Sequence, residues 1–227
     1  MRCSTIANFR LDSLVKKEPS DYAEWREETE RRFDSLTVLA GQDEHHVSPS
    51  GRSTLDISEY GAGDGSWNYS RGIAKAVETG KVIADVKRNY GDFWHCWVKQ
   101  KEDEFLLCGE DYQGYNVIDL NTCANAFTFP EEAFKGMGFC WAAVYPSPDG
   151  TVLAVEGCYW ACPYELVFID FSDPMKSPLP VLQRYAQLDV IEGWTDNLGF
   201  RFTAYDNEDE NPPSRPVVWA RGAEAKR

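Results

Sequence analysis

The sequence predicts an all-β fold of about four small antiparallel sheets, with one helix before them. Three observations lead to this prediction. From Thr54 onward, short apolar runs of strand length alternate with turn residues. The same strand, turn and strand layout returns at intervals of 43 to 51 residues. A helical spacing of apolar side chains marks positions 20–36, ahead of the repeats.

The composition is that of a folded and strongly acidic protein. Of 227 residues, 43% are hydrophobic and 14% aromatic, which is enough to build the core of one domain or of two small ones. The 37 acidic residues outnumber the 23 lysines and arginines, giving a formal net charge of -14. A surface of this charge repels phosphate backbones and anionic lipids. We therefore expect neither nucleic acid nor a membrane as partner.

Targeting features point to the cytoplasm. Charges at Arg10 and Asp12 interrupt the first apolar run, so no secretion signal is expected. The most apolar long stretch, residues 138–155, carries two prolines and an aspartate in its middle, which is incompatible with a membrane-spanning helix. The seven cysteines are an odd number, and without a secretion signal we expect free thiols.

Residues 1–53 are predicted to form an N-terminal segment that contains a helix over positions 20–36. Ser20 suits the N-cap, and charged residues occupy one face of the helix. On the other face, mostly apolar side chains recur at helical spacing: Tyr22, Trp25, Thr29, Phe33 and Leu36. Residues 41–52, which include His45 and His46, are rich in Gly, Asp and Ser and predict a loop.

A repeated hairpin organises the predicted domain at residues 54–220. Runs at 73–77 and 82–86 flank a turn with Gly80, which suits a turn that needs positive φ. The layout returns at 115–120 with 125–129, and again at 166–171 with 179–182. Thr79 and Thr122 lie 43 residues apart, and Asp173 follows Thr122 by 51.

The two later hairpins are each preceded by two further matching runs. Residues 94–98 align with 139–144, and 105–109 align with 152–157, so each unit has four short strands. A weaker fourth unit is expected from runs at 191–194, 200–205 and 217–220. The acidic run 206–213 predicts an exposed loop, and the tail 221–227 is expected to fray.

Several of these runs resemble WD-repeat and related β-propeller proteins. The resemblance covers residues 54–210 and depends on Pro-Ser-Pro-Asp-Gly at 146–150, with the apolar strands 152–155 and 167–171. It implies a propeller-like stack of sheets. With about four units, three propeller-like arrangements are possible: a four-bladed ring, an open or incomplete stack, and a ring completed by a dimer. A strongly twisted sandwich is a further alternative outside the propeller class.

Two loops that the internal alignment makes equivalent carry the predicted binding residues. Residues 109–115 and 157–165 both join the second and third strands of a unit, and equivalent turns of stacked sheets emerge on one rim. Large rings beside acids are typical of interaction hot spots. The candidates are Glu110, Asp111, Tyr112, Tyr159, Trp160 and Glu165. The alternative is that the rings cap the sheet ends or fold inward.

Catalytic and metal motifs are missing from the sequence. Cys158 and Cys162 lie four residues apart without a second pair, and His95 lies between two tryptophans on a predicted strand, so we expect no metal and no cofactor. There is no Gly-x-Ser-x-Gly, P-loop or His-Glu-x-x-His pattern, and no catalytic residue is assigned. An acid pair on the rim, Glu110 or Asp111 with Glu165, is the exception to consider, with solvated acidic turns as the alternative.

The sequence therefore favours a non-enzymatic protein-interaction module, as a monomer or a dimer. Its charge of -14 suits a basic protein partner, as in inhibitor or immunity proteins that neutralise basic toxins. The alternative is a small-molecule binder, or a hydrolase that uses acids on the aromatic rim. A deep pocket with converging carboxylates would favour the alternative, and a flat exposed aromatic patch would favour the module.

Overall fold

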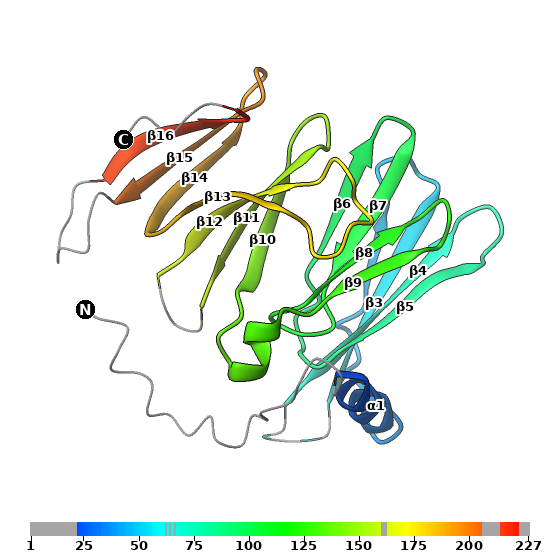
Figure 1. Ribbon diagram of the computed structural model, residues 1–227. Helices are drawn as coiled ribbons and strands as arrows, with labels where there is room; N and C mark the ends of the chain where they lie inside the picture. The colour runs from blue at the N-terminus through cyan, green and yellow to red at the C-terminus, as the bar shows by residue number, and fades with distance from the viewer. Residues whose placement is uncertain are drawn as a thin grey trace. The chain divides into compact units, whose positions relative to one another are not determined.

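The computed structural model describes residues 22–61, 63, 65, 67–159, 163–205 and 214–222 (Figure 1). It contains one α-helix, α1 (Tyr22–Phe33), a short 3-10 helix, η4 (Glu131–Lys135), and antiparallel strands numbered β1 to β16. The described residues divide into two compact units. The N-unit lies within Val15–Gly138 with Pro174–Pro178, and the C-unit consists of Phe139–Asp173 and Leu179–Arg227.

The N-unit contains two antiparallel sheets. Sheet A has the order β1 (Thr37–Val38), β3 (Ser53–Gly61), β4 (Tyr69–Ala76) and β5 (Val82–Arg88), with β2 (Glu44–Val47) also paired to β3. Sheet B is a meander of β6 (His95–Gln100), β7 (Asp103–Cys108), β8 (Tyr115–Asp119) and β9 (Asn125–Thr128). Neighbouring strands of sheet B are therefore also neighbours in sequence, and short turns suffice to join them.

The C-unit also contains two antiparallel sheets. Sheet C is a meander of β10 (Cys140–Pro146), β11 (Val152–Cys158), β12 (Glu165–Asp170) and β13 (Val181–Tyr185). Sheet D has three strands, β14 (Leu188–Trp194), β15 (Gly199–Tyr205) and β16 (Ser214–Ala220). The predicted all-β fold of four antiparallel sheets with one helix is confirmed, and none of the sheets closes into a barrel. Sheets in series are compatible with a propeller-like arrangement.

The predicted loop at residues 41–52 is wrong, because β2 lies within it. Its residues Glu44 to Val47 pair with Thr54 to Ile57 of β3. The strand escaped prediction because it is an edge strand with mostly exposed side chains, so it lacks the alternation of apolar and polar residues. The predicted helix is confirmed from Tyr22 to Phe33, but it ends before the predicted position 36, because the backbone N–H groups of Ser35 and Leu36 bond the carbonyls three residues back in a turn. Positions 20–21, 206–213 and 223–227 lie outside the described residues.

Each unit has its own apolar core, built from two sheets. In the N-unit the core residues come mainly from sheets A and B: Leu55, Ile57, Ala74, Val86, Phe93, Leu106, Cys108, Ile118 and Leu120. In the C-unit they come from sheets C and D: Val152, Ala154, Leu166, Phe168, Phe200, Phe202, Ala204 and Trp219. A Cβ at position 72 would lie 2.3 Å from the ring of Phe93, so only glycine lets that ring lie on β4.

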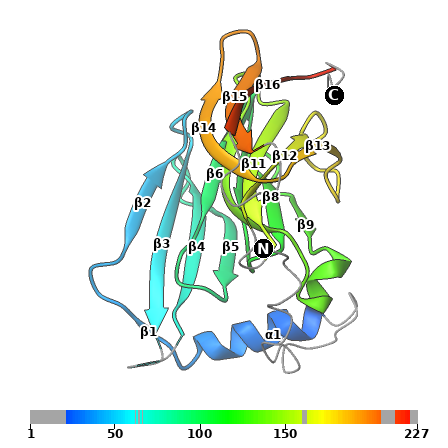
Figure 2. The same cartoon turned by 90° about the vertical axis from the view of Figure 1, so that its left-hand side faces the viewer.

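Helix α1 touches both sheets of the N-unit. At its C-terminal end, the Phe33 ring lies 4.9 Å from that of Tyr60 on β3. At its N-terminal end, Tyr22 stacks on Phe127 and Phe129, with ring centroids 4.8 and 4.3 Å apart. Figure 2 shows the helix lying across the ends of the N-unit strands. The helix therefore bridges the two sheets through aromatic rings, which bury a large area each.

Candidate functional site

The loop between β7 and β8 places three of the predicted binding residues together in the N-unit. Glu110, Asp111 and Tyr112 are consecutive, yet each has different surroundings: a pocket, a buried polar network and a surface cluster of rings. Tyr159 and Glu165 lie in the C-unit, and Trp160 lies outside the described residues. The prediction that both loops join the second and third strands of a sheet is confirmed.

The buried side chain of Arg88, at the end of β5, fixes the conformation of the loop between β7 and β8. Only 2% of the residue is exposed. Nη1 donates hydrogen bonds to the carbonyl oxygens of Gly109 and Asp111 at 2.8 and 2.6 Å, and Nε donates to the carbonyl of Asp92 at 2.8 Å. Burial lowers the pKa of Arg88, but a guanidinium stays protonated in proteins. A planar cation thus satisfies three backbone acceptors.

Asp111 belongs to the same buried network. One carboxylate oxygen accepts from Asn89 Nδ2 at 2.8 Å and the other from the Gln113 backbone N–H at 3.0 Å. Burial raises the pKa of Asp111, and these hydrogen bonds and the Arg88 charge oppose that rise. Since Asp111 is only 2% exposed, the alternative of a solvated acidic turn is wrong for this residue. Its carboxylate positions the loop.

Tyr112 lies on the outside of the loop, in an aromatic cluster formed with Trp67 and Tyr90. The ring centroids of Tyr90 and Tyr112 are 4.7 Å apart, and those of Trp67 and Tyr90 are 5.3 Å apart. Trp67 is 53% exposed, although its Nε1 donates to the Asn89 carbonyl at 2.7 Å. The Arg88 guanidinium carbon lies 5.8 and 5.7 Å from the centroids of the two tyrosine rings.

Sequence reasoning missed two members of this cluster. Trp67 and Tyr90 do not lie in the repeated loops; they flank the β4 and β5 hairpin. The register of that hairpin pairs Ser70 with Arg88, so the residues just before β4 and just after β5 emerge at the same end of sheet A. Reading the predicted hairpin register outward from its turn would have placed the two rings near each other.

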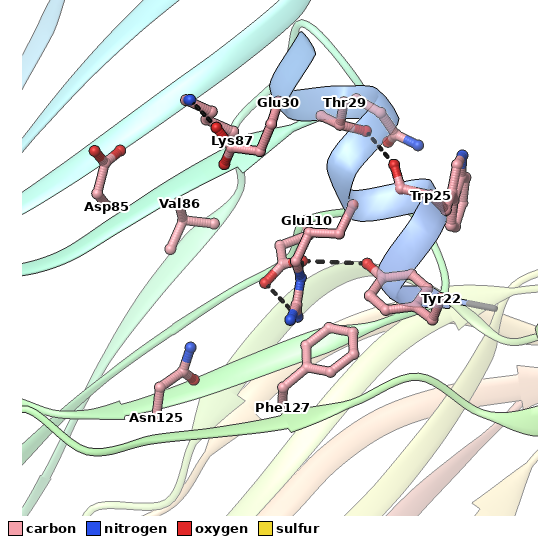
Figure 3. Close-up of a pocket in the computed structure, with 12 residues that line it drawn as sticks. Tyr22, Trp25, Thr29, Glu30, Asp85, Val86, Lys87, Glu110, Asn125 and Phe127 are labelled. Carbon is pink, nitrogen blue, oxygen red and sulfur yellow. Dashed lines mark hydrogen bonds and ion pairs between the residues drawn. The ribbon is translucent and has the colours of Figure 1, made fainter. Parts of the chain in front are cut away.

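Glu110 points to the other side of the loop, toward α1. It holds the Arg26 guanidinium with two hydrogen bonds, Nε to Oε2 at 2.6 Å and Nη2 to Oε1 at 3.0 Å. Figure 3 shows the Glu110 carboxylate facing Tyr22 of α1. The Tyr22 hydroxyl donates to the same carboxylate at 3.3 Å, and burial raises the pKa of this phenol. The Arg26 guanidinium also lies 4.5 Å from the centroid of the Phe127 ring.

A pocket of about 330 Å³ opens beside this contact. Its walls come from α1, β5, β9 and the end of the β7 and β8 loop: Tyr22, Trp25, Arg26, Thr29, Glu30, Asp85, Val86, Lys87, Asn89, Glu110, Asn125 and Phe127. Lys87 pairs with Glu30 across it, and Asp85 is held by Arg71 at 2.7 and 2.5 Å. The Arg71 hydrogen bonds lower the pKa of Asp85. The pocket is thus polar, with paired charges and an aromatic side.

The equivalent loop of the C-unit is also held by an arginine. Arg184 on β13 donates to the Tyr159 hydroxyl at 2.6 Å and lies 3.8 Å from the Glu165 carboxylate. The Tyr159 ring packs edge-on against Phe139, with centroids 5.3 Å apart. The structure therefore brings Tyr159 and Glu165 together around one cation, within the C-unit.

The three histidines gather at the edge of the N-unit sheets, and two of them touch. His45 and His46 lie on β2, so their predicted place in a loop is wrong, while His95 begins β6 as predicted. The rings of His46 and His95 have centroids 4.3 Å apart. His46 Nε2 bonds Glu44 at 2.7 Å, and His45 Nδ1 bonds Asp56 at 2.7 Å.

The His95 environment predicts a loss of stability in mild acid. Burial, and secondly the neighbouring His46, lower the pKa of His95 below 6.5. The unfolded chain then binds this proton more readily, so stability is complete above about pH 6.5 and falls as pH drops toward the folded-state pKa. We expect the urea midpoint to fall between pH 7.5 and 5.5, and His95→Gln to reduce that fall. His45→Gln, at an exposed position, is the control; an equal reduction in both variants would contradict the assignment.

The cysteines and acids of the described chain form no metal centre. Cys96, Cys108, Cys123, Cys140 and Cys158 are free, and Cys162 lies outside the described residues. Burial raises the pKa of Cys96 to about 12 and also raises that of Cys108, so both are unreactive thiols. Within the described ranges, no group of three His, Cys, Asp or Glu side chains is placed to hold a metal ion. Nor does any helix there have the length and apolar character needed to cross a membrane.

Fold and site together define a β-sheet repeat protein with a surface aromatic cluster and a small charged pocket. No protein family matches the chain. It is 43% identical over 144 residues to "Uncharacterized protein R762" of Acanthamoeba polyphaga mimivirus, a match that covers 63% of this chain and 56% of that protein. The chain thus spans about half the length of this relative. Hydrazine synthase of Kuenenia stuttgartiensis shares 14% identity with a TM-score of 0.36, over 72% of this chain and 56% of that one. Likeness this weak carries no functional information.

Proposed function

We propose that the protein is a non-enzymatic interaction module whose aromatic cluster binds a basic protein partner. The observation that carries this proposal is the position of Trp67, which is half exposed while its indole N–H is anchored to the Asn89 carbonyl. Trp and Tyr are enriched in binding hot spots because they present a large rigid surface with few rotatable bonds. An exposed yet anchored ring loses little entropy on binding.

The buried network beneath the cluster supports the same function. Arg88 holds the carbonyls of Gly109 and Asp111, and Asn89 connects Trp67 to the Asp111 carboxylate. These bonds hold the aromatic cluster in one arrangement before any partner arrives. A site organised in this way binds more tightly because less conformational freedom remains to be lost.

A basic partner follows from charge. The formal net charge of -14 attracts a cationic protein over distances beyond contact and speeds the encounter. Attraction between exposed charges weakens when salt shortens the Debye length, which is about 8 Å at 0.15 M ionic strength. Association with such a partner should therefore slow as salt is added.

Hydrolysis is the less well supported alternative. A catalytic carboxylate must reach substrate and exchange protons with it. Glu110 is instead bound at both oxygens by Arg26, and Asp111 is buried under hydrogen bonds from Asn89 and Gln113. Glu110 and Asp111, which the sequence offered as alternative partners of Glu165 in a hydrolytic pair, are therefore occupied in positioning the helix and the loop.

The experiment first captures the partner from native extract and then measures the affinity of that partner for the Trp67→Ala variant. The immobilised protein is exposed to native extract at low and high salt, retained proteins are identified, and the affinity of the purified partner is measured. We expect a basic protein, retained at low salt, whose affinity for Trp67→Ala falls by about 2 kcal/mol or more, or about 30-fold, with little change in the unfolding midpoint.

Met137→Ala is the matched control, because Met137 is an exposed apolar side chain of the same unit outside the cluster. Its affinity and its unfolding midpoint should both match those of the parent. Equal affinity of Trp67→Ala and the parent would refute the aromatic cluster as the binding surface. An acidic partner, or one whose binding ignores salt, would refute charge steering.

A further inference from the structure

Two cysteines lie opposite each other on neighbouring strands of sheet C (Figure 1). Cys140 begins β10, Cys158 ends β11, and the register of these antiparallel strands pairs the two residues directly. Directly opposite residues project from the same face of the sheet, with Cα atoms about 4.5 or 5.5 Å apart. Both are half-buried thiols in the structure. The hairpin of β10 and β11 therefore places two thiols side by side.

This placement suits a reversible disulfide. Cysteines in a disulfide have Cα atoms about 4.4–6.8 Å apart, so a directly opposed pair is within range without a large backbone movement. The bonded Cβ atoms must approach to about 3.8 Å, which is closer than in an ordinary cross-strand pair. The bond would therefore draw the two strands together against their packing. A strained or exposed disulfide is readily reduced again, so the pair suits a bond that forms and breaks.

The cysteines of sheet B show that this register is particular to sheet C. Cys96 on β6 pairs with Leu107, and Cys108 on β7 pairs with His95. Cys108 therefore projects from the same face as His95, whereas Cys96, the next residue of the strand, projects from the opposite face. A bond between these two cysteines would have to pass through the sheet. Of the five cysteines that the structure describes, only the pair in sheet C is directly opposed.

The pair adjoins the loop at residues 157–165, which carries predicted binding residues. Phe139 precedes Cys140 and Tyr159 follows Cys158, and the rings of these two neighbours pack edge-on with centroids 5.3 Å apart. The Arg184 guanidinium carbon lies 5.4 Å from the Phe139 centroid and 5.7 Å from the Tyr159 centroid. A bond between the two sulfurs would join the strand ends from which this contact extends. The oxidation state of the pair would then set how firmly the start of the loop is held.

We propose that Cys140 and Cys158 are a redox-sensitive pair, which a small disulfide such as oxidised glutathione converts to an intramolecular disulfide. One cysteine thiolate attacks a sulfur of the oxidant, forming a mixed disulfide and releasing one glutathione thiolate. The second cysteine thiolate attacks the mixed disulfide at the protein sulfur, forms the Cys140–Cys158 bond and releases the second glutathione. Two cysteine thiols are thereby oxidised, one glutathione disulfide is reduced, and the two protons pass through solvent to the released thiolates. The pair lies in the C-unit, so the inference does not depend on the proposed function of the N-unit cluster.

The direct test maps disulfides in the full chain. Reduced protein is incubated with oxidised glutathione, remaining thiols are alkylated, and the chain is cleaved with trypsin and with a protease that cuts after glutamate. Glu156 lies between the two cysteines, so cleavage there places them on separate peptides. We expect mass spectrometry to find these two peptides cross-linked and neither cysteine alkylated. An excess of reduced glutathione should remove the cross-link and restore both thiols.

Matched variants identify the two sulfurs. Cys140→Ser and Cys158→Ser should each abolish the cross-link and leave only a glutathione adduct on the remaining partner. Cys123→Ser removes a half-buried thiol between β8 and β9 and should leave the cross-link unchanged. Cys162→Ser removes the other thiol of the peptide that carries Cys158, and it should also leave the cross-link unchanged. Urea unfolding midpoints of the reduced proteins establish that all four variants fold.

Amide hydrogen exchange measures the effect of the bond on the loop. Oxidation should slow exchange at Cys158 and Tyr159 and leave exchange at Cys123 unchanged, because the bond restrains only the ends of β10 and β11. Equal exchange in the two states would show that the bond does not hold the loop.

Several results of the mapping would overturn the inference. A bond between Cys158 and Cys162, or a cross-link that persists in Cys140→Ser, would assign the reactive pair to other sulfurs. Mixed disulfides without a cross-link, or thiols that all stay reduced, would show that the opposed cysteines do not approach closely enough to bond. A cross-link that excess reduced glutathione leaves intact would contradict a reversible pair.

Discussion

Replacing Arg88 with methionine is expected to lower the free energy of unfolding by about 3–5 kcal/mol. Methionine fills much of the same space but donates no hydrogen bonds. The carbonyls of Gly109, Asp111 and Asp92 would lose their donor, and the buried Asp111 carboxylate would lose its nearby positive charge. The cost is large because these groups are removed from water, where they would find other partners.

Urea unfolding at neutral pH measures this loss, with Arg52→Met as the matched control. Arg52 is exposed, and its side chain donates to the Glu102 carbonyl at 2.9 Å and to Ser50 Oγ at 3.3 Å, where water can replace it, so its replacement should cost less than about 1 kcal/mol. Arg88→Lys keeps the charge but not the planar set of donors, and should lie between Met and the parent. A change for Arg88→Met as small as that for Arg52→Met would show that the network does not hold the loop.

Replacing Phe168 with alanine is expected to destabilise the C-unit by about 3–5 kcal/mol. Phe168 is fully buried, and its ring stacks on that of Trp219 with centroids 4.0 Å apart and planes 7° apart. Its centroid also lies 5.6 and 6.2 Å from those of Phe200 and Phe202. Phe168 therefore joins sheet C to sheet D, and its removal leaves a cavity that strands in fixed register cannot close.

Calorimetry and tryptophan fluorescence follow this variant, since Trp219 stacks directly on the deleted ring. Val181→Ala, on the exposed edge strand β13 of the same sheet, is the control and should cost less than about 1 kcal/mol. A Phe168→Ala protein whose melting temperature matches that of Val181→Ala would contradict a core shared by the two sheets.

The strands were predictable because their signals are local. A strand such as β12 is a run of apolar residues, Leu166 to Ile169, ended by a turn, and β4 and β5 enclose a turn with Gly80 in the left-handed region. Repetition of these signals then predicted one sheet per repeat. Strand β2 was missed because its side chains face solvent, and apolar alternation appears only where one face is buried.

The loop residues of the candidate site were predictable because their signals are also local. Glu110 and Tyr112 were singled out because acids and rings are conspicuous in a short loop. Their surroundings depend on segments far away in sequence: Arg26 from α1 for Glu110, and Trp67 and Tyr90 for Tyr112. No pattern within the loop indicates those contacts.

By itself, the sequence determined the class of fold, the number of sheets, the helix that precedes them and the acidic character, because each depends on neighbouring residues or on composition alone. Tertiary structure decided which side of the loop at 110–112 each side chain faces, and how Arg88 and Asp111 become buried. It also created the pocket, whose walls come from α1, β5 and β9. The physical reason is that hydrogen bonds and ring contacts between distant segments arise only when the sheets pack, and packing joins residues that no sequence period connects.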